Sequence, residues 1–363
     1  MARTIVQRRW RRRAVALVVV AAVIGVLVAV AATGHAFAIE ERRVRIETAA
    51  GVLDAVLATP PGAVEPTGVV VFVHGDGPVD ATSDGFYRPI WEDLARAGYA
   101  SLSWSKPGVG GSTGDWLDQS LADRAAEVGA ALDWVVEQPG VDPRRVGLWG
   151  ASQGGWVVPA VAARRDDVAF AILVSPAVNW LRQGRYHLLA SLDHEGASAA
   201  DRERAIAASD DTRRLLDERA DYARYREETI DPEPMTRARW GFVARNYRAD
   251  ATPDLVAMAG RDVPTLLLLA DGDLNVDADE TERVYRDLLG EDVRVRRFAG
   301  ARHSLARAAV EDDAVLGLVT GVLAPRRVFV PGYTSAQREF LLGLEHGRPT
   351  ASSSRTPGLG SAP

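Results

Sequence analysis

Short apolar runs alternate with segments of helical spacing along most of the chain. Residues 68–73 are apolar without a break, which is typical of a strand covered on both faces. Runs of this kind predict strands at 42–58 (a pair around Gly51), 68–73, 99–104, 146–149, 168–174, 264–270 and 292–298. Apolar residues spaced for one helical face predict helices at 90–97, 119–138, 152–164, 278–289 and 303–323.

This alternation of strands and helices predicts an α/β fold built on a doubly wound, mostly parallel sheet. The segment 178–262 breaks the alternation, because it is charged, has helical signals and shows no strand pattern. We therefore expect a helical cap at 178–262, inserted between two parts of the core at 39–177 and 263–345. The tail at 346–363, rich in Ser, Pro and Gly, is expected to be disordered.

The N-terminal segment 1–38 carries a membrane-directing pattern. Five arginines between Arg8 and Arg13 precede an uncharged apolar run at 14–32. The length of the run favours a retained signal anchor, because about 20 residues span the hydrocarbon core of a membrane. The alternative is a signal peptide cleaved near Ala38, which would release a secreted protein. Both interpretations place residues 39–363 outside the cytoplasm. We expect the protein to be held at the cell membrane by its N-terminal anchor.

Composition removes several classes of function. The chain of 363 residues contains no cysteine, which excludes thiolate metal sites, a cysteine nucleophile and disulfides. Lys106 is the only lysine, so a lysine-based mechanism would have to use it. Beyond residue 38 the chain has 37 basic and 49 acidic residues, a net charge of −12. A body this acidic argues against a nucleic-acid partner.

A Gly-x-Ser-x-Gly sequence around Ser152 lies where a strand is predicted to meet a helix. Small residues two positions before and after the serine permit a turn so sharp that larger side chains would collide. The turn leaves the serine exposed at its tip, which makes Ser152 the candidate nucleophile. The five-residue pattern alone is weak evidence, because it also arises by chance. Its position directly after an apolar strand makes it stronger evidence for a nucleophile.

A second glycine-rich turn, His-Gly-Asp-Gly at 74–77, follows the strand predicted at 68–73. Such a turn can aim a backbone N–H at a pocket, and together with the N–H of Gln153 it would form an oxyanion hole. We expect the N–H of Asp76 to be the donor, with that of Gly75 as the second choice. An ordinary turn at the end of a strand is the alternative.

Two later strand ends supply an acid and a histidine. Asp271 and Asp273 follow the strand at 264–270, and either could orient a histidine, with Asp277 as a weaker candidate. A solvated turn is the alternative. Of the six histidines, only His303 follows the acid at the end of a later strand. The order serine, acid, histidine is that of the α/β-hydrolase architecture.

The chain from about residue 42 to 324 resembles the α/β-hydrolase superfamily, in particular bacterial serine esterases and peptidase-like hydrolases with a helical cap. The resemblance rests on the turn around Ser152, on Ala-Asp-Gly-Asp at 270–273 and on the glycine-rich loop at 104–114, which looks like the family's Arg-Gly-x-Gly-x-Ser loop. The family's acid aligns with the last position of Ala-Asp-Gly-Asp, so the resemblance selects Asp273 over Asp271. The resemblance implies that no cofactor is needed.

These residues predict a serine hydrolase that cleaves a carboxylic ester or amide of a small molecule through an acyl-enzyme on Ser152, with His303 as base. An acyltransferase with the same three residues and a peptidase of the S33 or S9 kind are alternatives, and a non-catalytic binding protein is less favoured. No phosphate-loop or zinc motif occurs. Apolar cap residues could line the substrate pocket, although we expect most of them to pack the cap's own core: Trp180, Tyr186, Leu188, Leu189, Tyr222, Tyr225, Trp240 and Phe242.

Overall fold

The computed structural model describes residues 2–63 and 67–346, and the side chains from residue 17 onward. A sheet of eight strands forms its centre, in the order β1-β2-β4-β3-β5-β6-β7-β8. The strands are β1 (Glu40–Thr48), β2 (Gly51–Thr59), β3 (Thr67–Val73), β4 (Tyr99–Trp104), β5 (Val141–Ala151), β6 (Ala171–Val174), β7 (Thr265–Ala270) and β8 (Val293–Phe298). β2 runs antiparallel to both β1 and β4, and the other neighbours are parallel. The predicted doubly wound, mostly parallel sheet is confirmed.

Two hydrophobic layers cover the sheet because its central strands are apolar on both faces. In β3, Val69, Val71 and Val73 belong to one layer, whereas Val70 and Phe72 belong to the other, as the alternation of side chains along a strand requires. The first layer contains α3 (Leu121–Val136), α4 (Gly154–Ala162), α9 (Thr252–Ala259) and α10 (Ala278–Leu289). The second contains α2 (Arg88–Arg96) and α13 (Tyr333–His346).

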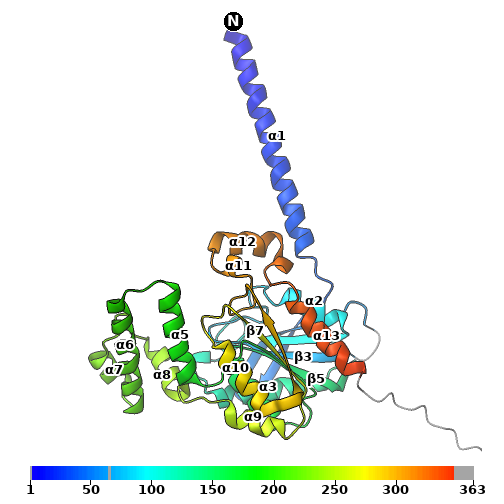
Figure 1. Ribbon diagram of the computed structural model, residues 1–363. Coiled ribbons are helices and arrows are strands. Elements are labelled where there is room, and N and C mark those ends of the chain that lie inside the picture. The colour runs from blue at the N-terminus through cyan, green and yellow to red at the C-terminus, as the bar shows by residue number, and fades with distance from the viewer. Residues whose placement is uncertain (1, 64–66, 347–363) are drawn as a thin grey trace, which may run out of the picture.

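The segment between β6 and β7 is helical. Before α9 it forms α5 (Trp180–His194), α6 (Ala199–Asp217), α7 (Tyr222–Glu228) and α8 (Arg237–Asn246), which we call the cap helices. Figure 1 shows them together at one side of the body, whereas α9 lies under the sheet near α10. Leu215, Tyr225, Trp240 and Phe242 form a small core of their own within this group.

The structure departs from the expected helices at three places. The helix expected at 303–323 is wrong in its first part, because residues 303–307 form a loop before α11 (Ala308–Glu311) and α12 (Ala314–Leu323). Asp313 caps α12 and so separates it from α11. α4 begins at Gly154 and not at Ser152. α13 was not expected, although its buried residues have helical spacing: Tyr333, Gln337, Phe340 and Leu341. From residue 347 the predicted tail lies outside the described residues.

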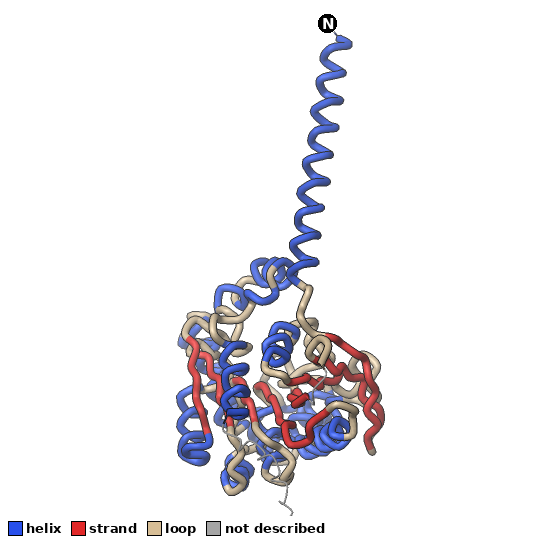
Figure 2. The backbone as a smooth tube through the Cα atoms, turned by 90° about the vertical axis from the view of Figure 1, so that its right-hand side faces the viewer, coloured by secondary structure: helices blue, strands red, loops and turns tan. Residues whose placement is uncertain are grey.

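The N-terminal helix α1 (Ala2–Gly34) projects away from the body (Figures 1 and 2). Its stretch Leu17–Gly34 is long and apolar enough to cross a membrane, and the fold buries none of it. Arg326 holds the foot of this helix, because its guanidinium donates to the carbonyls of Gly34 and Ala36 at 2.6 and 2.9 Å. The same guanidinium binds the carboxylate of Glu92 in α2 at 2.6 and 2.9 Å. Specific contacts therefore join the apolar helix to the body.

Candidate active site

Ser152 lies in a tight turn between β5 and α4. Its φ is +52°, in the left-handed region that a residue with a side chain rarely adopts. The glycines of the motif make this turn possible. A Cβ on Gly150 would lie 2.6 Å from Cγ2 of Val158, and one on Gly154 would lie 2.9 Å from the Val73 carbonyl oxygen. The Gly-x-Ser-x-Gly pattern thus has a steric cause, and the turn presents Ser152 at the carboxyl edge of the sheet.

Asp273 and His303 form a hydrogen-bonded pair at the same edge, after β7 and β8. Nδ1 of His303 lies 3.0 and 2.8 Å from the two carboxylate oxygens of Asp273. The carboxylate is almost fully buried and accepts the backbone N–H groups of Asn275 and Val276 at 2.8 and 3.0 Å. Burial raises the pKa of Asp273, but the charge and hydrogen bond of His303 and the two amides outweigh it, so the pKa is lowered. A carboxylate therefore faces Nδ1, which leaves Nε2 for proton transfer.

The other candidate acids have different partners. Asp271 pairs with Arg297 at 2.7 Å on the surface. Asp277 accepts backbone N–H groups at the start of α10 and acts as its cap. Within the described part of the chain, neither carboxylate is hydrogen-bonded to a histidine.

The glycine turn at 74–77 passes directly over Ser152. A Cβ on Gly75 would lie 3.2 Å from Cβ of Ser152 and 3.9 Å from its Oγ. Across residues 2–63 and 67–346, the backbone N–H groups of Gly75, Asp76 and Gln153 donate to no protein group. The Ser152 hydroxyl also lacks a hydrogen-bond partner there. Two loops thus bring unpaired N–H donors close to the serine, which is what an oxyanion hole requires.

Two buried cations hold the carbonyl groups of this turn. Nζ of Lys106 donates to the Gly75 carbonyl at 2.6 Å and lies 4.8 Å from the centre of the Trp116 ring. Arg124 of α3 donates to the His74 carbonyl at 2.6 Å and to the side-chain oxygen of Gln153 at 2.5 Å. Burial lowers the pKa of Lys106, and the nearby charge of Arg124 lowers it further. Through its two hydrogen bonds, Arg124 binds both loops that carry the predicted oxyanion donors, the turn at 74–77 and the turn at Gln153.

A salt bridge from the cap helix α8 holds the side chain of Asp76. Arg239 donates to its two carboxylate oxygens at 3.0 and 2.7 Å, and Nε2 of Gln153 donates to one of them at 3.2 Å. Burial raises the pKa of Asp76, but the hydrogen bonds and charge of Arg239 outweigh it and lower the pKa. The two predicted oxyanion residues thus bind each other and the cap through their side chains.

His74 lies in the same turn but is enclosed. Nε2 donates to the Trp104 carbonyl at 2.5 Å, so Nδ1 accepts the hydroxyl of Tyr87 at 2.9 Å. Burial, with a further contribution from the charge of Lys106, lowers the pKa of His74 to about 3. The ring is therefore neutral at pH 7 with both nitrogens occupied, and it is not available as a base.

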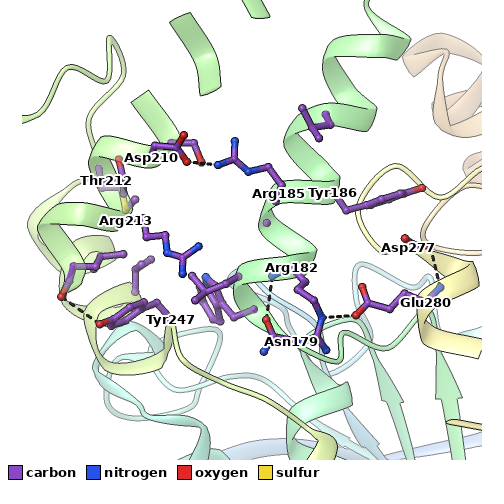
Figure 3. Close-up of a pocket in the computed structure, with 18 of the residues that line it drawn as sticks. Asn179, Arg182, Arg185, Tyr186, Asp210, Thr212, Arg213, Tyr247, Asp277 and Glu280 are labelled. Carbon is purple, nitrogen blue, oxygen red and sulfur yellow. Dashed lines mark hydrogen bonds and ion pairs between the residues drawn. The ribbon is translucent and has the colours of Figure 1, made fainter. Parts of the chain in front are cut away.

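A cavity of about 870 Å³ lies among α5, α6, α8 and the start of α10 (Figure 3). Arg185 and Asp210 face each other across it and form an ion pair. Ser152 and His303 do not line it. It adjoins their site through the cap, because the Tyr186 hydroxyl donates to the Asp273 carbonyl at 2.9 Å and Arg239 binds Asp76 of the glycine turn. Of the apolar cap candidates, three line this cavity: Trp180, Tyr186 and Leu189.

Sequence reasoning missed the three basic side chains around the glycine turn at 74–77, those of Lys106, Arg124 and Arg239. Lys106 carried a usable signal, because it is the only lysine in a chain rich in arginine and stands in a motif loop. The sequence gives no signal for Arg124 or Arg239, because each is one of many charged residues in a segment of helical spacing. In the described part of the chain, no group of three or more His, Asp or Glu side chains is placed to hold a metal ion.

The fold matches solved structures at low sequence identity. Est1E from Butyrivibrio proteoclasticus, in its complex with ferulic acid, is 19% identical with a TM-score of 0.54, covering 84% of this chain and 99% of that one. The esterase Pf2001 from Pyrococcus furiosus is 15% identical with a TM-score of 0.53, covering 84% of this chain and 90% of that one. Similarity at this level shows the α/β-hydrolase fold.

Sequence comparison gives a more direct assignment. The polyketide transferase grgF from a Penicillium species is 33% identical over 137 residues, which cover 35% of this chain and 47% of that protein. The chain thus spans about half the length of this curated relative. The serine aminopeptidase S33 family matches residues 64–308, more than half of the chain. The protein therefore belongs to the serine aminopeptidase S33 family and has the α/β-hydrolase fold.

Proposed function

We propose that the protein is an esterase that forms an acyl-enzyme on Ser152, with His303 as the general base and Asp273 as the residue that orients it. The observation that carries this proposal is the pairing of His303 with a buried carboxylate at the sheet edge where Ser152 occupies its strained turn. The esterases among the structural neighbours support an ester as the substrate. No cofactor enters the reaction.

In the first half-reaction, Nε2 of His303 takes the proton of the Ser152 hydroxyl while Oγ attacks the ester carbonyl carbon. Asp273 accepts the Nδ1–H of His303 and stabilises the imidazolium that forms. The tetrahedral intermediate then collapses. The alcohol leaves with the proton from His303, and the acyl group stays on Ser152.

The negative oxygen of the tetrahedral intermediate would be bound by the N–H groups of Asp76 and Gln153. A donor of this kind is worth about 3–4 kcal/mol of transition-state stabilisation. Lys106 and Arg124 support this role, because they fix the neighbouring carbonyls and leave the amides unpaired. The oxyanion hole would therefore be formed before substrate binds.

In the second half-reaction, His303 takes a proton from water while the water oxygen attacks the acyl carbon. The bond between that carbon and Oγ of Ser152 then breaks, His303 returns the proton to Oγ, and the acid is released. The cap cavity would admit one substituent of the ester. Its wall combines aromatic and aliphatic side chains with guanidinium and carboxylate groups, which suits a substituent that has a polar end.

Acyl transfer to an alcohol or amine is the second candidate, and the partial identity with a polyketide transferase favours it. The same acyl-enzyme serves both reactions, and the acceptor decides the outcome. Adding a primary alcohol to the ester assay separates them. A transferase gives mostly the new ester, whereas a hydrolase gives mostly the free acid. An aminoacyl p-nitroanilide tests the peptidase alternative in parallel.

We further propose that α1 is a retained anchor and that the catalytic body lies outside the cytoplasm. Three features support retention: the apolar stretch Leu17–Gly34, the arginine cluster before it in the sequence, and the contacts of its foot with the body. The residues around the alternative cleavage site take part in these contacts, since Ala36 binds Arg326 and the Ala38 N–H donates to Glu92 at 3.0 Å.

The test uses the full chain in detergent or nanodiscs, a fluorophosphonate probe and p-nitrophenyl butyrate. Wild type should be labelled and should turn over the ester, and both activities should be lost in Ser152→Ala and His303→Ala. Ser335→Ala, which removes a hydroxyl of α13 outside the site, is the control and should behave as wild type. Labelling that survives Ser152→Ala, or a folded wild type that is never labelled, would exclude the proposed nucleophile.

A further inference from the structure

The surface beside the foot of α1 is apolar to a degree that is unusual for a surface in water. α12 contains no charged residue, and none of its residues is buried. Five of its aliphatic side chains are between 42% and 71% exposed: Val315, Leu316, Leu318, Val319 and Val322. A surface helix of a soluble domain normally turns a polar face outward. A continuous apolar patch of this kind marks an interaction site.

The end of α12 is fixed against the end of the apolar stretch of α1. Nε2 of His35 donates to the Val322 carbonyl at 3.1 Å. A Cβ on Gly34 would lie 2.9 Å from the Leu323 carbonyl oxygen, so the two backbones are in contact. Arg326, just beyond α12, binds the Gly34 carbonyl. If α1 spans a membrane, α12 therefore lies at the level where the span ends.

We propose that α12 lies in the lipid–water interface of the membrane in which α1 is anchored, so that the body rests on the bilayer through a second element. Figure 1 shows α12 running across the foot of α1 and not along it, and Figure 2 shows its region on the same side of the body. This inference rests on the proposed anchoring role of α1 and is independent of the serine chemistry.

Length and flanking charges favour the membrane surface over a second span. The ten residues of α12 measure about 15 Å, half of the hydrocarbon thickness of about 30 Å. Asp312 and Asp313 precede the helix, and Arg326 and Arg327 follow it closely. A helix that is too short to cross the bilayer, bounded by charges at both ends and held beside a membrane span, fits in the plane of the interface better than across the membrane.

The position of α12 also matters for the candidate active site. Arg302, next to His303, donates to the carboxylate of Asp312 at 2.9 and 2.7 Å. The Ser304 hydroxyl donates to Glu311. Both residues flanking His303 are thus bound to the segment that leads into α12, and docking would hold this loop near the lipid surface.

The absence of cysteine permits a direct test in the full chain. The single variants Leu318→Cys in α12, Val23→Cys in α1 and Val256→Cys in α9 are labelled with the fluorophore NBD. Each labelled protein is placed in phosphatidylcholine–phosphatidylglycerol nanodiscs. Val256 is the matched control, because it is 55% exposed and α9 lies on the side of the body away from α1 (Figure 1). Quenching is measured with nitroxide-labelled lipids and with iodide in the water. A circular dichroism spectrum and a thermal unfolding midpoint equal to those of the unlabelled wild type show that each labelled protein is folded.

We expect lipid nitroxides to quench the labels at 23 and 318 several-fold more than the label at 256, and iodide to show the reverse order. A label at 318 that behaves like the one at 256, while the label at 23 is quenched by lipid, would refute the role of α12 and leave the anchor standing. A label at 23 outside the lipid would refute the anchor itself. A label at 318 shielded from both quenchers would mean that protein, such as a second copy of the chain, covers α12, which also overturns the proposal.

Discussion

Replacing Lys106 with methionine should weaken catalysis without removing any group that touches the substrate. The Gly75 carbonyl and the Asp76 N–H are opposite ends of one planar trans peptide unit, so they point in opposite directions. The 2.6 Å hydrogen bond from Nζ to the carbonyl therefore also determines where the N–H points. Methionine keeps the length of the side chain and its packing against Trp116 but cannot donate this bond.

The expected size of the effect lies between two limits. Leaving a buried carbonyl without its donor costs about 1–3 kcal/mol, which the turn can relieve by rotating the peptide unit. Complete loss of one oxyanion donor costs about 2.7–4 kcal/mol in the transition state. We expect a loss of about 1.4–2.7 kcal/mol, which is a fall in kcat of about 10- to 100-fold, with KM nearly unchanged.

Ester kinetics combined with inhibition by an alkyl boronic acid test this reasoning. The tetrahedral boronate adduct of Ser152 places an oxygen where the oxyanion forms, so its inhibition constant should rise in step with the fall in kcat. Arg248→Met, which removes a cation largely exposed on the cap, is the control and should change neither value. A normal kcat in Lys106→Met, or a loss that appears only in KM, would show that Lys106 does not orient the donor.

Four further predictions concern the surrounding residues. Asp273→Asn should lower kcat by about 10⁴-fold in ester assays, because the amide no longer holds the correct tautomer of the base. Arg239→Met should lower kcat/KM by less than about tenfold, since its salt bridge is partly exposed and such pairs contribute about 0–1 kcal/mol. His74 contributes its full stabilisation above pH 6.5 and loses about 1.4 kcal/mol per pH unit as the pH falls from 6.5 toward 3, so His74→Asn should flatten the pH dependence of denaturant unfolding in that range. Gly155→Ala should destabilise by about 1–3 kcal/mol in the same unfolding assay, because its Cβ would lie 2.6 Å from the Ala177 carbonyl oxygen, whereas Gly184→Ala, with open space around it, should not.

The sheet could be predicted because its strands are encoded by neighbouring residues. The unbroken apolar run of β3 and the close approach of Gly150 to Val158 each have a local physical cause, and local causes can be read in order along a chain. The break between the His303 loop and α12 was missed because apolar composition continued across the Asp312–Asp313 junction and outweighed a capping signal. The roles of Arg124 and Arg239 depend on contacts with residues 29 to 163 positions away, which no local pattern records.

The contact between Arg326 and the foot of α1 has a consequence for the order of biosynthesis. Its partners Gly34 and Ala36 are made 292 and 290 residues earlier, so this contact cannot form until residue 326 has left the ribosome. Contacts between residues so distant in sequence form late, after more local structure. If α1 is anchored as proposed, it reaches the membrane before Arg326 has been made and can be bound to the body only afterwards. The sheet would then fold before its orientation relative to α1 is fixed. Binding of Arg326 to Gly34 and Ala36 would fix that orientation.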